Sequence, residues 1–306
     1  MHGLAASSGS ADGALHIAIG IATTGRRDIL RDVFPYMLRQ HRLPDEVIIC
    51  AADKNDVDPA ALDQSGLPVR VLFSERGLCR QRNQILRAAS NADVVLFLDD
   101  DFLMAPSYLE EMERVFCADP SIVMCTGTVK ADGITGPGLA ITDALAVLDR
   151  QPATATGETS PIYNGYGCNM ALRMAPVREH DLAFDENLPL YGWLEDVDFS
   201  RQMASHGRIV RSARLIGVHL GTKAGRTSGL RFGYSQIANP IYLMGKRTMS
   251  LKHASAQIAR NLAANTIKLF APEPWVDRRG RFYGNLRALA DLARGRLAPQ
   301  NILSLE

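Results

Sequence analysis

Continuous apolar runs that alternate with helix-like segments constrain the fold of this chain more than any other feature. Five runs are short enough to be strands, at residues 16–22, 46–51, 69–73, 94–98 and 122–125. Apolar side chains at helical spacing occupy intervals between them, at residues 28–41, 80–89 and 107–117. Such an alternation is typical of a sheet covered by helices on both faces, so the sequence predicts an α/β fold with a Rossmann-type, mainly parallel sheet.

The pattern changes after the fifth run. Residues 130–167 are rich in Gly, Pro, Thr and Ser around one expected helix at 139–148, and this composition predicts a loop region near a functional site. Regular structure then returns in two strands and two helices, expected at residues 169–173, 195–206, 215–220 and 258–270. From about residue 230 onward the chain reads as a helical extension.

Charged residues are distributed unevenly along the chain, although its formal net charge is only +1. Segment 223–306 holds 14 Lys and Arg against 4 Asp and Glu, so the part before it is acidic. We therefore expect a flexible tail at 1–14, an α/β domain at 15–222 and a basic helical extension at 223–306. The extension could bind an anionic membrane face or could be a solvated basic face, and no nucleic-acid partner is expected.

Cysteine usage and hydropathy bear on the location of the protein. The five cysteines form no CxxC pair, are odd in number and lie partly in apolar runs, which favours buried, reduced thiols. No apolar run reaches the ~18 residues of a membrane span, and the first 14 residues lack the pattern of a signal peptide. We expect a cytoplasmic protein that associates at most peripherally with the inner face of the cell membrane.

Asp99, Asp100 and Asp101 follow the apolar run at residues 94–98 directly. Adjacent carboxylates repel one another, which is hard to reconcile with a buried strand end unless a cation binds there. Side chains alternate along a strand, so Asp99 and Asp101 should point the same way, one toward a ribose hydroxyl and the other toward a divalent ion. Oxygen ligands favour Mg²⁺ or Mn²⁺ bridging a diphosphate. The alternative is a helix cap and a solvated turn before Pro106.

Other polar residues also fall where the expected strands end. Thr23, Asp53 and Arg76 lie at such ends, and ligands of parallel sheets bind beyond the carboxyl ends of the strands. His219 ends a later strand, although a lone histidine is more often structural than a ligand. The sequence therefore predicts one ligand site at this edge of the sheet.

Glu195 and Asp196 open the expected helix at 195–206, two residues after Trp193. Two acidic residues at a helix start can simply complement the helix dipole, which contributes ~0.3–1 kcal/mol. The functional alternative is catalysis, because a helix N-terminus favours the ionised carboxylate that a general base requires. A further segment, 164–167, could let the backbone approach a sugar or could be a plain turn.

Three segments together resemble the motifs of family 2 glycosyltransferases, which have the GT-A fold. Residues 98–101, Leu-Asp-Asp-Asp, resemble the DxD signature of that family. Residues 75–83, Glu-Arg-Gly-Leu-Cys-Arg-Gln-Arg-Asn, are similar to its GxxxARN segment, and residues 192–196, Gly-Trp-Leu-Glu-Asp, resemble its (G/W)xxED motif. All three occur in the order of the family, and the resemblance covers about residues 17–220.

The resemblance implies an inverting, metal-dependent glycosyltransferase of the bacterial polysaccharide-synthesis type. The donor would be a nucleoside-diphosphate sugar, with uridine diphosphate favoured, and the acceptor a saccharide or a lipid-linked saccharide. Asp196 would be the general base with Glu195 beside it, and Asp101 and His219 would bind Mn²⁺ or Mg²⁺. The residues expected to bind the donor are Thr23, Asp53, Arg76, Arg80, Asn83, Asp99, Asp100 and Trp193.

The chain departs from the family pattern at two places. The second strand ends in Ala51-Ala52-Asp53-Lys54 instead of Asp-Asp-Gly-Ser, so only Asp53 can be carried over as the contact to the base. The ARN segment reads Arg80-Gln81-Arg82-Asn83. Two rival functions stay open: a sugar-phosphate nucleotidyltransferase, for which residues 23–27 would form a poor Gly-rich loop, and a non-catalytic nucleotide-sugar-binding module.

Overall fold

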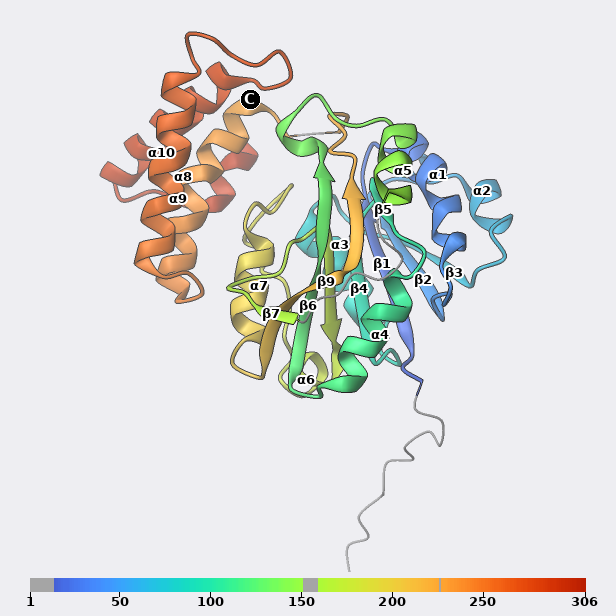
Figure 1. Cartoon of the computed structure of the whole chain (residues 1–306). Coiled ribbons are helices and arrows are strands. Elements are labelled where there is room, and N and C mark those ends of the chain that lie inside the picture. Colours follow the sequence, from blue (N-terminus) through green and yellow to red (C-terminus); the bar gives the residue numbers. More distant parts are fainter. Residues whose placement is uncertain (1–13, 151–158, 226) are drawn as a thin grey trace, which may run out of the picture.

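The computed structural model describes residues 14–150, 159–225 and 227–306, so the predicted flexible tail at 1–14 lies almost wholly outside the described residues. Figure 1 shows a central sheet with helices on both faces and a separate group of helices, at the left, formed by the end of the chain. The strand order is β3-β2-β1-β4-β8-β6-β9-β5, and β7 pairs with β9. This architecture confirms the predicted α/β fold with a helical C-terminal extension.

Four strands from the first third of the chain form the parallel half of the sheet. They are β1 (Ile17–Thr23), β2 (Glu46–Ala51), β3 (Val69–Phe73) and β4 (Val94–Asp99). β1 lies between β2 and β4, and all pairings among the four strands are parallel. β1, β2 and β4 are buried along nearly their whole length, which explains why the sequence shows them as unbroken apolar runs.

Helices cover both faces of the sheet. One face packs against apolar residues of α1 (Arg27–Val33), α2 (Pro59–Asp63) and α4 (Tyr108–Ala118). The other face packs against α3 (Leu78–Ala88), α6 (Met174–Glu179) and α7 (Glu195–Met203). A further helix, α5 (Ile141–Asp149), packs beside the end of β9. The three motif segments therefore lie on or next to β4, α3 and α7.

The helix predicted at residues 28–41 is α-helical only in its first half. α1 ends at Val33, and the chain continues as the 3₁₀ helix η1 (Phe34–Arg39). Pro35 has no N–H to donate to the carbonyl of Arg31, so the α-helical bonding pattern stops there. A second 3₁₀ turn, η2 (Lys54–Asp56), follows β2.

The other half of the sheet contains both parallel and antiparallel pairs, a detail that the sequence analysis did not predict. β8 (Asn169–Arg173) runs antiparallel to both β4 and β6 (Ile122–Asp132). β9 (Arg208–His219) is parallel to β6, whereas β5 (Phe102–Met104) and β7 (Thr159–Pro161) are antiparallel to β9. A strand that is buried on both faces has the same apolar pattern in either direction, so the sequence could not reveal the reversal.

Two strands are much longer than the apolar runs that predicted them. The prediction covered residues 122–125 and 215–220, whereas β6 continues to Asp132 and β9 begins at Arg208. The added stretches are half-exposed or alternate between buried and exposed positions. They therefore carry polar residues, and no apolar run marks them as strands in the sequence. The predicted loop at 130–167 accordingly starts later, with the 3₁₀ turn η3 (Gly133–Thr135).

The C-terminal extension has a small core of its own. It consists of α8 (Gly229–Lys246), α9 (Leu251–Ile267), α10 (Arg278–Ala293) and the 3₁₀ helix η4 (Pro299–Ser304). α8 and α10 approach closely through glycines: a Cβ atom on Gly284 would lie 2.1 Å from the carbonyl oxygen of Leu230. Tyr234, Ile237 and Ile302 form the buried centre of this unit.

The extension docks beside α7 through polar contacts and through the buried side chains of Leu243 and Met249. The Asn239 side-chain amide donates to the carbonyl oxygen of Trp193 at 2.7 Å. The Lys246 ammonium donates to Asp185 and to the buried Asp198 of α7, both at 2.7 Å. Across the described ranges, no helix combines the length and apolar character that crossing a membrane requires.

Candidate active site

The three aspartates at the end of β4 point in two directions. Asp100 turns toward β1, where it accepts hydrogen bonds from Thr23 Oγ1 at 2.7 Å and from Arg26 Nη1 at 2.9 Å. Asp99 and Asp101 both face His219 at the end of β9. The side-chain alternation of a strand predicted this shared direction. The backbone N–H of Thr222 donates to Asp101 Oδ2 at 2.8 Å and helps to fix that carboxylate.

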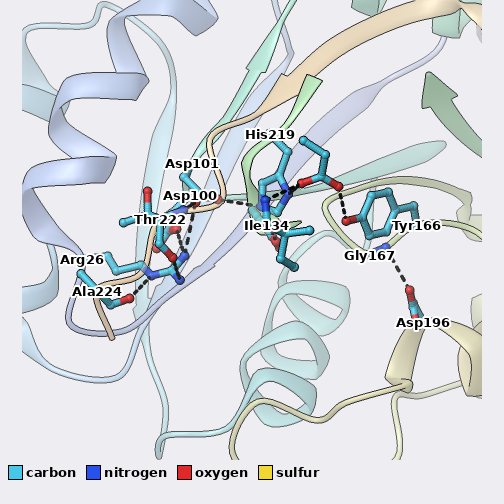
Figure 2. Close-up of polar contacts among 12 residues, drawn as sticks. Arg26, Asp100, Asp101, Ile134, Tyr166, Gly167, Asp196, His219, Thr222 and Ala224 are labelled. Atoms are coloured by element: carbon cyan, nitrogen blue, oxygen red, sulfur yellow. Dashed lines mark hydrogen bonds and ion pairs between the residues drawn. The ribbon is translucent and has the colours of Figure 1, made fainter. Parts of the chain in front are cut away.

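Asp99, Asp101 and His219 offer ligand atoms that lie within 4.8 Å of one another. His219 Nε2 is 3.2 Å from Asp101 Oδ1 and 3.6 Å from Asp99 Oδ2. The other ring nitrogen, Nδ1, is 2.9 Å from Asp132 Oδ1, and the Tyr166 hydroxyl donates to Asp132 Oδ2 at 2.7 Å (Figure 2). A carboxylate that accepts from Nδ1–H fixes the ring orientation and directs Nε2 toward a metal position.

The donor set fits a hard divalent cation. Asp101 Oδ1 is buried and makes no hydrogen bond of good geometry, even with His219 Nε2 only 3.2 Å away. Burial opposes ionisation of Asp101, but the adjacent His219 lowers the pKa of Asp101 to about 2. Burial also disfavours a charged His219, yet its contacts with Asp101 and Asp132 raise the pKa of His219 to about 10, so a bound cation would replace the Nε2 proton. Ionised carboxylates with an imidazole suit Mn²⁺ or Mg²⁺.

Arg26 is a site residue that the sequence prediction missed. Its guanidinium pairs with Asp100 and lies 3.8 Å from Asp101 Oδ2. It also donates to the carbonyl oxygens of Thr222 and Ala224, so it ties the end of β4 to the segment after β9 (Figure 2). Burial raises the pKa of Asp100 to about 6, against the lowering effect of Arg26. The sequence signal was the pair of basic residues right after the first strand.

Arg82 connects the DxD segment with the ED segment. The sequence prediction, in contrast, assigned the donor contact to Arg80. The Arg82 guanidinium is buried, donates to Glu195 Oε1 at 2.6 Å and lies 3.6 Å from Asp99 Oδ1. It also donates to the carbonyl oxygen of Gly167 at 2.8 Å. Arg80, two residues earlier on α3, is exposed and pairs with the surface residue Glu75.

Glu195 and Asp196 begin α7 after a tight backbone turn. Leu194, the residue before the helix, has φ of 74°, in the left-handed region. Asp196 accepts from its own helix at Val197 N, 2.8 Å away, and from Gly167 N, 3.2 Å away. Burial raises the pKa of Asp196. Burial and the Asp196 charge raise the pKa of Glu195, whereas the Arg82 charge lowers it.

The remaining predicted donor residues lie outside this cluster. Asp53 is exposed and caps η2 by accepting from the backbone of Asn55, and Arg76 is exposed in the loop before α3. Asn83 is buried, and its side chain bonds to the backbone of Phe184 on both its oxygen and its nitrogen. These contacts give Asn83 a structural role in holding the segment before α7, and they leave its predicted donor contact without support from this arrangement.

One pocket of about 350 Å³ collects the central residues. Its lining includes residues of the candidate metal group and of the ED segment, namely Asp99, Trp193, Glu195, Asp196 and His219. Arg82, which the prediction missed as a site residue, lines it too. The cavity therefore places a candidate cation site and a candidate general base around one space, as a transfer to an acceptor hydroxyl requires.

This combination of a mixed sheet, an acidic strand end with a histidine and a carboxylate pair at a helix start defines a GT-A glycosyltransferase. The family described as glycosyl transferase family 2 matches residues 18–180, and the chain belongs to this family. A search of curated protein sequences gives no significant match.

Solved structures support the same fold. S. aureus TarS is 17% identical with a TM-score of 0.54, over 84% of this chain but only 44% of TarS. A structure of TarS residues 1–349 with UDP-GlcNAc has a TM-score of 0.58 at 14% identity, covering 95% of this chain and 84% of that one. The mannosyltransferase PcManGT from Pyrobaculum calidifontis, with GDP-Man and Mn²⁺, gives 0.55 at 13% identity, covering 95% and 85%.

Proposed function

We propose that the protein is an inverting, metal-dependent glycosyltransferase that moves a sugar from a nucleoside-diphosphate sugar to an acceptor hydroxyl. One observation carries the proposal: Asp99 and His219 of the candidate metal group line the same pocket as Asp196. The first two would hold the cation and diphosphate of the donor, and the third would face the acceptor. A nucleotidyltransferase has less support, because Arg26 after the first strand is committed to Asp100 and to two backbone carbonyls.

The transfer follows from the positions of the chain's own carboxylates. Asp196 takes the proton of the acceptor hydroxyl while the oxygen attacks the anomeric carbon from the side opposite the diphosphate. The new glycosidic C–O bond forms as the bond between the anomeric carbon and the diphosphate oxygen breaks, and the diphosphate leaves with that electron pair. A divalent cation bound by Asp99, Asp101 and His219 would supply positive charge for the leaving group. Arg82 pairs with Glu195 and keeps this second carboxylate in place.

The decisive experiment replaces the two acidic residues of α7 separately. Asp196→Asn preserves shape but removes basicity, so turnover should fall at least ~10²-fold with little change in donor affinity. Glu195→Gln should affect the chemical step less, because this carboxylate already accepts a hydrogen bond from Arg82. Transfer is followed by release of nucleoside diphosphate in a purified assay. Normal turnover by Asp196→Asn would contradict its role, and release of pyrophosphate from a nucleoside triphosphate would favour the nucleotidyltransferase.

A uridine diphosphate sugar is the proposed donor, with Thr23, Asp53, Arg76, Arg80 and Asn83 as its predicted contacts. TarS was solved with UDP-GlcNAc and PcManGT with GDP-Man, so related folds bind either nucleotide. Calorimetry should detect UDP binding with Mn²⁺ or Mg²⁺, and a chelator should weaken it, because a cation held by Asp101 would supply positive charge for the diphosphate. Asp101→Ala should lose this metal dependence. Tighter binding of GDP than of UDP would overturn the choice of donor and leave the transferase proposal intact.

The acceptor is proposed to be a saccharide or a lipid-linked saccharide of cell-surface polysaccharide synthesis, at the cytoplasmic face of the membrane. Support comes from the basic extension, which holds 14 Lys and Arg against 4 Asp and Glu. It also exposes large apolar side chains, such as Phe270 at 87% and Ile267 at 72%. Basic and apolar groups on one unit suit a peripheral contact with anionic lipid.

A further inference from the structure

The wall of the pocket includes residues from outside the α/β domain. His253 and Gln257 of α9 line it together with Tyr163, in the same cavity as Asp196. His253, Gln257 and Tyr163 belong neither to the candidate metal group nor to the carboxylate pair of α7. The helical extension therefore helps to form the active-site pocket, and its contribution needs a function.

His253 is exposed, but its ring is held in a fixed orientation. The ring stacks on Tyr163 with centroids 4.0 Å apart and planes inclined by 14°. Its Nδ1 lies 2.7 Å from Oγ of Ser250, the residue that caps α9. The guanidinium of Arg201 lies 4.6 Å from the centroid of the Tyr163 ring. A ring fixed by such contacts loses little freedom when a ligand binds, which favours affinity.

The chemistry of this wall suits a sugar ring. The aromatic faces of His253 and Trp193 can attract the C–H groups of a pyranose, because the ring faces carry negative charge density. The Gln257 amide can both donate to and accept from neighbouring hydroxyls. Inversion brings the acceptor to the side of the anomeric carbon opposite the diphosphate, where Asp196 must reach its hydroxyl. The groups lining the pocket near α9 are thus available to the acceptor.

We propose that His253 and Gln257 of α9 bind the terminal sugar ring of a saccharide acceptor, together with Trp193. This inference rests on the proposed function, since it assigns the acceptor of the same transfer. It makes the helical extension a part of the acceptor site in addition to any contact with lipid. The group recognised there is a sugar, not an acyl chain or a polypeptide.

Tryptophan fluorescence can test the subsite without turnover. The chain has two tryptophans, so Trp275→Phe leaves Trp193 as the single reporter in the pocket. Methyl glycosides of glucose, galactose, mannose and N-acetylglucosamine serve as probes at millimolar concentration. At least one should change the Trp193 emission saturably, and His253→Ala and Gln257→Ala should each weaken that response by about tenfold. Lys252→Ala, on the same helix but outside the pocket, should leave it unchanged.

Two further measurements separate the possible failures. His253→Phe keeps a ring on Tyr163 and should retain more affinity than His253→Ala, and thermal unfolding checks that every variant is folded. Binding of UDP with Mn²⁺ should be the same in all α9 variants, because that site lies at the end of β4. If UDP binds but no glycoside changes the Trp193 emission, or if both alanine variants respond like the parent, the subsite is disproved. If nucleotides fail to bind the parent, the proposed transferase function fails instead.

Discussion

Arg82 is the side chain that connects the carboxylates of β4 with those of α7. Arg82 is only 2% exposed, and its guanidinium carbon lies 5.3 Å from the ring centroid of Phe97 and 5.4 Å from that of Phe184. A cation this deeply buried is tolerated only where anions compensate it, and here Glu195 and Asp99 do so. Arg82 therefore compensates the carboxylate charge at the end of β4 and the carboxylate charge at the start of α7.

The pH dependence of transfer should report this charge balance. The Arg82 charge lowers the pKa of Asp196, which burial raises, so Arg82→Gln should raise that pKa further. A general base works when ionised, and activity is lost as the pH falls through its pKa. The acid limb of kcat/KM should therefore move to higher pH in Arg82→Gln. Arg82→Lys retains the charge and should move the limb less, and identical limbs in all three proteins would refute the coupling.

The sequence contains enough information to identify Arg82, and not Arg80, as the arginine of the site. The family motif has one arginine in this segment, whereas this chain has two with a glutamine between them. On α3, Cys79, Arg82 and Leu86 are buried at spacings of three and four, whereas Arg80 is exposed. Helical periodicity would have selected Arg82. The basic pair after the first strand marks Arg26 in the sequence, but no local pattern could reveal its contacts with Thr222 and Ala224, which lie almost 200 residues away.

At the level of elements, the packing of α8 against α10 depends on glycines that permit close approach. Gly284→Ala would put a methyl group 2.1 Å from the carbonyl oxygen of Leu230, so the helices must separate. Overpacking of this kind costs about 1–3 kcal/mol, and thermal or urea unfolding should show that loss. Gly245→Ala is the matched control, because a Cβ there meets nothing within 4 Å and should stabilise α8 by up to ~1 kcal/mol. Equal effects of the two substitutions would contradict this account.

The elements that the sequence predicted well are those whose burial is uniform. β1, β2 and β4 lie between two helical layers, so apolar runs followed by polar residues marked both the strands and the ligand-binding edge of the sheet. β5 and β7 have three residues each, too few for a pattern. The contribution of α9 to the pocket was also beyond prediction, because it depends on how the extension docks through Asn239 and Lys246. Local periodicity carries no information on such long-range contacts.

At the scale of the whole molecule, the basic and the acidic parts of the chain belong to different structural units. The basic residues of segment 223–306 belong to the helical unit beside the α/β domain, at the left in Figure 1. The acidic residues of the pocket, Asp99, Glu195 and Asp196, belong to the α/β domain. Exposed apolar side chains of the same unit include Leu251, Ile267, Phe270 and Tyr283. One unit thus combines a wall of the pocket with exposed basic and apolar side chains.

Vesicle binding should distinguish this surface from a merely solvated basic face. We expect the protein to sediment with vesicles of phosphatidylglycerol and phosphatidylcholine at low salt, but not with pure phosphatidylcholine. Each basic residue near an anionic surface contributes ~1 kcal/mol, and salt screens this attraction. Arg279→Glu and Phe270→Ser should each reduce binding, since Arg279 is exposed on α10 and Phe270 is 87% exposed. Leu43→Ser changes an exposed apolar residue of the α/β domain and should have no effect. If the protein does not sediment with vesicles at low salt, the extension has only its role in the pocket. If all three variants lose vesicle binding equally, binding belongs to the whole surface of the protein and not to this unit.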